Sequence, residues 1–142
     1  MSAIAVGHEV PAQDFPIKRV DLVRYAGAAL DFNPIHWNER FAKSVGLPDV
    51  IAHGMFTMAS AIRIVTDWAG DPGAVLEYSV RFTRPVVVPD PDGAILHVAG
   101  VVRTVRDDGL LEVDLTCTVD GQTVLAKARA VVRAPGTPQE PA

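Results

Sequence analysis

Residues 54–68 read GMFTMASAIRIVTDW, and this stretch decides the fold. Its apolar side chains recur at helical spacing and cover most of the circumference, which predicts a helix buried on nearly all sides. At a rise of 1.5 Å per residue, such a helix is about 22 Å long and crosses a small domain. The turn-forming sequence GDPG at 70–73 ends it. A helix of this kind needs a layer of other elements around it.

Four segments in the second half of the chain provide that layer. Apolar and polar residues alternate over 76–83, 95–105, 111–119 and 123–133, and Asp-Gly pairs at 108–109 and 120–121 mark hairpins. The predicted core face of the last strand is mostly small: Val124, Ala126, Ala128, Ala130 and Val132. The sequence therefore predicts an α+β hot-dog fold, an antiparallel sheet wrapped around a long buried central helix. A second subunit would cover the exposed sheet edge.

The first half of the chain predicts smaller elements. A short edge strand covers 10–18, and a helix runs over 21–30 with Leu22, Val23, Tyr25 and Ala26 on one buried face. A second short helix covers 38–45. No linker interrupts the chain, so we expect one domain over 1–133 and a flexible Pro-rich tail over 134–142.

Composition excludes several classes of protein. With 142 residues, 49% of them hydrophobic, the chain has enough apolar surface to fold as a single globular domain. No run approaches the ~20 apolar residues of a membrane-spanning helix, and the net charge of −4 gives no basic surface for nucleic acid. A lone cysteine, Cys117, and an N-terminus unlike a signal peptide favour the cytoplasm.

The densest signal for chemistry is the segment Asp31-Phe32-Asn33-Pro34-Ile35-His36. It places a carboxylate and an imidazole five residues apart, around a proline-stiffened loop between two helices. Adding water next to a carbonyl, or removing it, needs one group that takes a proton and one that delivers it. Histidine titrates near neutrality and serves in both directions. Asp31 and His36 are therefore the candidate catalytic pair.

A second signal is Gly54, at the start of the long helix. A helix N-terminus carries unpaired N–H groups and the positive end of the helix dipole. A thioester carbonyl placed against the Gly54 N–H would have its developing negative charge stabilised there. Glycine leaves the approach to the backbone open, because it has no Cβ.

Each of these residues also has a simpler interpretation. Asp31 is of a type that caps turns, His36 alone would be a structural histidine, and we expect His53 to fix the loop before the helix. Asp31, His36 and His53 are of the types that bind zinc, but their spacing matches no metal motif, so no metal is expected. Another set recurs every three residues and is expected to form a polar strip: Thr57, Ser60 and Arg63.

Taken together, residues 25–36 (YAGAALDFNPIH), 52–55 (AHGM), 68–75 (WAGDPGAV) and 77–83 (EYSVRFT) carry a resemblance to a known family. The chain resembles the MaoC-like (R)-specific enoyl hydratases and dehydratases, and within them the catalytic subunits of (3R)-hydroxyacyl carrier-protein dehydratases. Where the family has a small pair before the motif aspartate, this chain has Ala29-Leu30. A positive φ at that place would strain Leu30.

The resemblance implies reversible dehydration of a (3R)-hydroxyacyl thioester to the trans-2-enoyl thioester. Asp31 and His36 would handle the water and the C2 proton, Asn33 would orient that pair, and the Gly54 N–H would polarise the thioester carbonyl. It implies no metal or redox cofactor, a substrate carried on the pantetheine arm of acyl carrier protein (ACP) or CoA, and a homodimer or a heterodimer with a second hot-dog subunit. Two other functions stay open at this point, a hot-dog thioesterase and a non-catalytic acyl-binding partner subunit.

Overall fold

The computed structural model describes residues 4–137, and its elements follow the predicted order. The strands are β1 (Glu9–Ile17), β2 (Val75–Phe82), β3 (Ala94–Val105), β4 (Leu111–Val119) and β5 (Gln122–Val132). The helices are α1 (Arg19–Ala29), α2 (Glu39–Ser44) and α3 (Gly54–Ala69), with 3₁₀ turns at Pro34–His36 and Pro72–Ala74. Residues 138–142 of the predicted tail lie outside the described residues.

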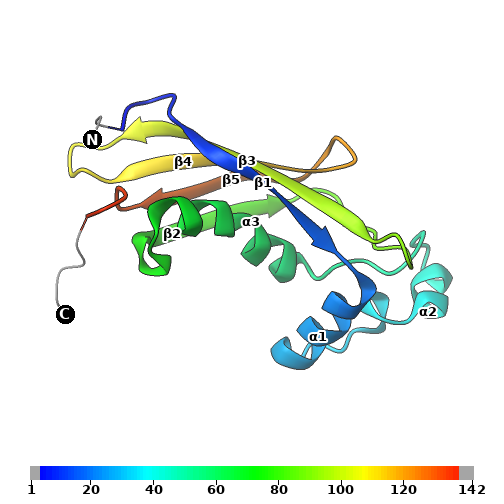
Figure 1. Cartoon of the computed structure of the whole chain (residues 1–142). Coiled ribbons are helices and arrows are strands. Elements are labelled where there is room, and N and C mark those ends of the chain that lie inside the picture. Colours follow the sequence, from blue (N-terminus) through cyan, green and yellow to red (C-terminus); the bar gives the residue numbers. More distant parts are fainter. Residues whose placement is uncertain (1–3, 138–142) are drawn as a thin grey trace.

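The five strands form one antiparallel sheet in the order β1-β3-β4-β5-β2. Strands β3, β4 and β5 are consecutive hairpins, while β1 and β2 close the two edges. Helix α3 packs along one face of this sheet (Figure 1). This is the predicted hot-dog arrangement, and it brings the N-terminus of α3 close to the end of β2.

Helix α3 is less enclosed than its sequence predicts. Its buried residues, among them Ala61, Ile64 and Val65, lie toward the sheet. The prediction that it is buried on nearly all sides is wrong, because an exposed stripe runs along it at four-residue spacing: Met55, Ala59, Arg63 and Asp67. The sheet curls around one side of the helix only.

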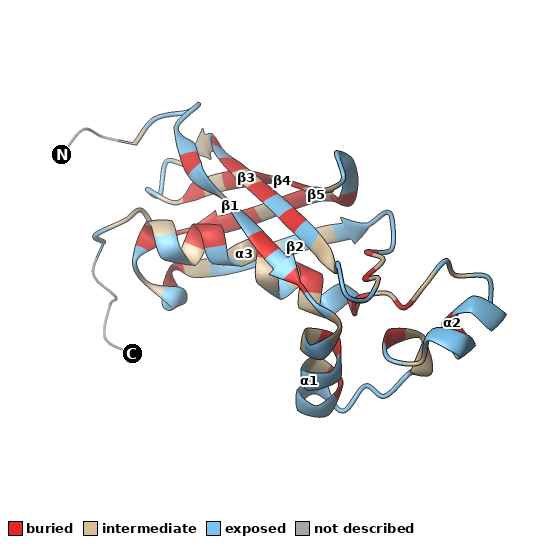
Figure 2. Cartoon of the chain, turned by 45° about the vertical axis from the view of Figure 1, so that its right-hand side comes forward, coloured by how far each residue is buried: buried red, intermediate tan, exposed pale blue. Residues whose placement is uncertain are grey.

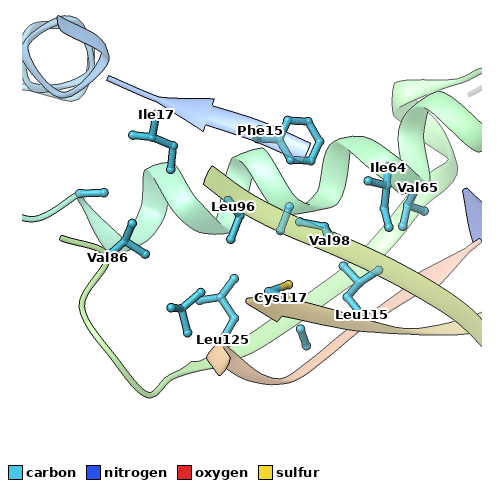
Figure 3. Packing of buried hydrophobic residues seen from close by; sticks show 14 of the residues in the cluster. Phe15, Ile17, Ile64, Val65, Val86, Leu96, Val98, Leu115, Cys117 and Leu125 are labelled. Carbon is cyan, nitrogen blue, oxygen red and sulfur yellow. The ribbon is translucent and has the colours of Figure 1, made fainter. Parts of the chain in front are cut away.

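The core lies between α3 and the sheet. Inward side chains of β3 and β4, including Leu96, Val98 and Leu115, meet Ile64 and Val65 of the helix (Figure 3). Gly100 of β3 lies at a position that faces the core. A Cβ there would stand 3.2 Å from Ile64 Cδ1 and 3.2 Å from Leu115 Cδ2. The missing side chain lets α3 approach the middle of the sheet.

A bulge changes which residues of β5 face the core. Lys127 has a positive φ of 49°, and the register with β4 shifts between the pairs Leu115–Ala128 and Cys117–Leu125. The predicted core position Ala126 is therefore wrong, and Leu125 takes the buried place. A β-bulge adds one residue to a strand and so reverses the facing of the residues beyond it.

Helices α1 and α2 lie beyond the end of the sheet and are largely exposed (Figure 2). In α1 the predicted face is partly correct, since Leu22 and Ala26 are buried but Val23 is 55% exposed. The segment that carries Asp31 and His36 joins these two helices. Within the described residues, no helix is long and apolar enough to cross a membrane.

Leu30 ends α1 in the left-handed conformation, with φ 57° and ψ 28°, and is 76% exposed. The left-handed conformation lowers the stability of the fold by about 1–2 kcal/mol when a leucine adopts it, because the Cβ crowds the following carbonyl oxygen. We expect Leu30→Gly to raise the free energy of unfolding by about 1 kcal/mol, since strain is relieved and little burial is lost. Urea denaturation measures the change.

Ala29→Gly is the matched control for this prediction. Ala29 precedes Leu30 and lies within α1, where glycine costs roughly 0.5–1 kcal/mol of stability. The two neighbouring glycine substitutions should therefore change stability in opposite directions. Equal destabilisation by both would show that the left-handed conformation of Leu30 carries no strain.

Candidate active site

Three candidate residues from the sequence lie close together in the structure: Asp31, His36 and His53. One ligand atom each from Asp31, His36 and His53 lies within 4.8 Å of the others. The two imidazole rings are stacked, with centroids 3.7 Å apart and planes at 23°. His36 and His53 are buried, whereas the side chain of Asp31 is 53% exposed. The carboxylate therefore reaches solvent while the imidazoles lie inside the fold.

The hydrogen bond of His36 fixes its tautomer. Its Nδ1 lies 2.6 Å from the main-chain oxygen of Ile51, and because a carbonyl only accepts, Nδ1 carries the proton. Burial lowers the pKa of His36 below its ordinary value of 6.5, and the nearby His53 lowers it further, against the opposing effects of Ile51 and Asp31. At neutral pH the ring is uncharged, and Nε2 keeps a lone pair that can take a proton.

Local hydrogen bonds shape the loop between α1 and α2. Asp31 Oδ1 accepts from the N–H of Asn33 at 3.2 Å, and Asn33 Oδ1 accepts from the N–H of Ile35 at 3.2 Å. Asp31 thus stabilises the turn, as its simpler interpretation has it, and still lies beside the two histidines. Asn33 is exposed and caps the 3₁₀ turn that ends in His36.

A cavity of about 310 Å³ opens next to this cluster. His36 and Gly54 both line it, and Asp31 and Asn33 do not. Gly54 is the first residue of α3, so its N–H has no partner within the helix. A Cβ at Gly54 would stand 2.9 Å from the ring of Phe82, so any side chain there would require that ring to move. A base and a helix N-terminus therefore share one cavity.

The cavity also contains residues that sequence reasoning placed elsewhere or missed. Thr57 was expected on a polar strip with Ser60 and Arg63, and that prediction is wrong, because Thr57 is 2% exposed and lines the cavity. It follows Gly54 by one helical turn, a spacing that places both on one face. Phe82 and Arg84 line the cavity from the end of β2, and no local signal indicates this.

Asp31, His36 and His53 are of types that bind a metal ion. The structure brings their ligand atoms together, although the spacing in sequence matches no metal motif. A histidine lone pair lies in the plane of its ring, so two rings stacked with centroids 3.7 Å apart and planes at 23° hold their lone pairs in separate planes, which is unfavourable for binding one shared ion. The arrangement suits proton transfer better than metal binding.

A family model described as the MaoC like domain matches residues 2–120. The chain belongs to the MaoC-like family. Among curated proteins, it is 43% identical over 115 residues to 3-hydroxyacyl-thioester dehydratase X of Mycobacterium tuberculosis, covering 78% of this chain. It is 31% identical over 120 residues to the (R)-specific enoyl-CoA hydratase of Rhodospirillum rubrum, covering 84% of this chain. The chain spans 39% of the length of the first relative and 81% of the second.

Solved MaoC-like structures share the fold. A chain described as a MaoC-like dehydratase superposes with a TM-score of 0.89 at 41% identity, over 92% of this chain and 41% of that one. The HadBC (3R)-hydroxyacyl-ACP dehydratase complex of M. tuberculosis has a TM-score of 0.71 at 20% identity, over 92% of this chain and 98% of that one. The hot-dog fold predicted from the sequence is confirmed.

Proposed function

We propose that this MaoC-like chain catalyses the reversible dehydration of (3R)-hydroxyacyl thioesters to trans-2-enoyl thioesters. One observation carries the proposal: His36 and Gly54 line the same cavity, and a ligand atom of Asp31 lies within 4.8 Å of one on His36. The names of the two curated relatives, a thioester dehydratase and an enoyl-CoA hydratase, support it. The substrate is a thioester on the pantetheine arm of ACP or CoA, within fatty-acid or related acyl-chain metabolism.

In the hydration direction, the enoyl thioester binds with its carbonyl oxygen at the Gly54 N–H. Asp31 and the Nε2 atom of His36 hold a water molecule, and His36 removes its proton as the oxygen attacks C3. Electron density moves from the C2–C3 double bond onto the thioester oxygen, where the helix N-terminus stabilises the enolate. The proton now on His36 Nε2 is then transferred to C2, which completes the hydroxyacyl product and returns His36 to its neutral form. Dehydration follows the same steps in reverse.

We also propose that the working enzyme is a homodimer or a heterodimer with a second hot-dog subunit. Strand β2 is a sheet edge, and two of its apolar side chains are exposed, Leu76 at 47% and Phe82 at 53%. Covering such an unpaired edge with a second subunit would satisfy its backbone groups and bury its exposed apolar residues. The HadBC dehydratase, which shares the fold, is described as a complex.

A spectrophotometric assay of the purified chain with enoyl-CoA thioesters of several lengths tests the function. We expect the enoyl absorbance to fall without release of free thiol, and the rate to survive treatment with EDTA. Release of free thiol in step with the loss of absorbance would mean a thioesterase, because hydrolysis also removes the conjugated thioester. Loss of activity on chelation would mean that the Asp31–His36–His53 cluster works with a metal.

If the chain alone is inactive, mixing it with a candidate partner subunit tests the heterodimer. Activity that appears only in the mixture would support a heterodimer, and it would place the acid–base pair on this chain if Asp31→Asn in this chain alone abolishes it. Activity that survives this substitution would assign the chemistry to the partner and leave this chain as an acyl-binding subunit.

A further inference from the structure

His53 contacts both members of the proposed catalytic pair. It lies at the N-cap of α3, is 3% exposed, and makes no cap hydrogen bond with its side chain. Its Nε2 instead lies 3.0 Å from the main-chain oxygen of Asp31, 22 residues earlier in the chain. Because that oxygen only accepts, His53 Nε2 carries the proton and donates it. The expectation that His53 fixes the loop before α3 explains neither its hydrogen bond to Asp31 nor its stacking on His36.

The ring of His53 also limits how His36 can move. Its centroid lies 3.7 Å from that of His36, and the ring of Tyr25 lies 4.8 Å from it at an interplanar angle of 58°. His36 is thus held by the stack and by its Nδ1 hydrogen bond to Ile51. One side chain therefore contacts the ring of His36 and the main chain of Asp31.

An imidazole is costly at this place. His53 Nδ1 is buried and has no hydrogen-bond partner within residues 4–137. A buried polar atom without a partner destabilises a fold by roughly 1–3 kcal/mol. A purely apolar side chain would pack without that cost, so packing alone does not favour histidine here. What the imidazole adds is the Nε2–H bond to Asp31.

We propose that His53 is a positioning residue that holds the Asp31 main chain beside the ring of His36. This inference rests on the proposed function, because the proposed function assigns Asp31 and His36 their roles as the acid–base pair. His53 also precedes Gly54 directly, so the same residue joins the acid–base pair to the N–H group at the start of α3. Misplacing a reacting group by about 1 Å can lower a rate about 10²-fold.

The matched test compares His53→Gln with His53→Met. The two side chains have nearly the same length and shape, and glutamine alone keeps an N–H at the Nε2 position that can reach Asp31. We expect His53→Met to lower kcat by roughly 10–10²-fold relative to His53→Gln, with KM changed much less. If the methionine variant does not fold, His53→Phe takes its place. Equal kcat in the two variants would overturn the proposal.

A second readout does not depend on activity. NMR titration of His36 senses the groups that face it, which are the Asp31 carboxylate, the His53 ring and the Ile51 carbonyl. Both variants remove the imidazole at position 53, but only methionine releases Asp31, whose charge raises the pKa of His36. We therefore expect a lower pKa of His36 with methionine than with glutamine.

The same titration in an Asp31→Asn background isolates the cause. If His53 acts through Asp31, the difference between the two variants disappears in that background. A difference that persists would mean that His53 affects His36 by packing alone, against the proposal. Wild-type protein that never hydrates an enoyl thioester would reject the proposed function, while the titration would still decide the role of His53.

Discussion

His36→Asn should lower kcat for enoyl-thioester hydration by about 10²–10⁴-fold and leave the fold intact. The asparagine Nδ2 occupies the place of the imidazole Nδ1 and can still donate to the Ile51 oxygen, but no base remains at the Nε2 position. Asp31→Asn should have an effect of similar size. It keeps the oxygen that accepts from Asn33 and loses only the charge. Steady-state kinetics with circular dichroism of each variant measures both effects.

The chain contains a matched control for these substitutions. Asp14 and His97 also form a close pair, with His97 Nδ1 2.6 Å from Asp14 Oδ1, on exposed positions of β1 and β3 outside the cavity. Asp14→Asn and His97→Asn should leave kcat unchanged. Near-native turnover in the His36 or Asp31 variant would remove that residue from the mechanism. A loss of similar size in the control pair would mean that the assay reports fold stability.

Gly54→Pro should lower kcat by about 10²–10³-fold relative to Gly54→Ala, the range for loss of one oxyanion donor. Proline is well tolerated at the first position of a helix, where its missing N–H has no partner within the helix. His53 precedes it with φ −59° and ψ 134°, a conformation that a residue before proline readily adopts. Proline therefore removes the donor with little change to α3.

Alanine provides the comparison because it carries the same Cβ. In both variants that Cβ meets the Phe82 ring, which must move by a few tenths of an ångström or more, so the steric cost is shared. Only proline lacks the N–H. If the two variants lose activity equally, the Gly54 N–H does not stabilise the reaction, and glycine serves there only to leave space.

The elements that depend on local pattern could be predicted from the sequence. The alternation along β3 and β4, the Asp-Gly hairpins and the apolar run in α3 indicate their structures within a few residues, because strand and helix periods differ. The proximity of Asp31 and His36 could also be predicted, since a short proline-stiffened loop cannot carry them far apart. The start of α3 at Gly54 could be predicted as well, while the roles of these residues stay proposals.

Features that depend on long-range packing could not be predicted in the same way. The apolar run over residues 54–68 does not reveal that one stripe of α3 faces outward, because Met55 is as apolar as the residues that face the core. The bulge at Lys127, which places Leu125 in the core where Ala126 was predicted, arises from the register with β4. The stack of His53 on His36 joins segments whose approach only the finished fold determines.

Burial of His36 links the reactivity of the site to the resistance of the whole fold to acid. The folded chain binds a proton at His36 less readily than the unfolded chain, whose histidine has the ordinary pKa of 6.5. The contribution of His36 to stability is therefore complete above that pH and declines as the pH falls below it, because protons favour the unfolded state. The burial that keeps the proposed base uncharged at neutrality thus makes the fold more sensitive to acid, and any variant that buries the ring further increases that sensitivity.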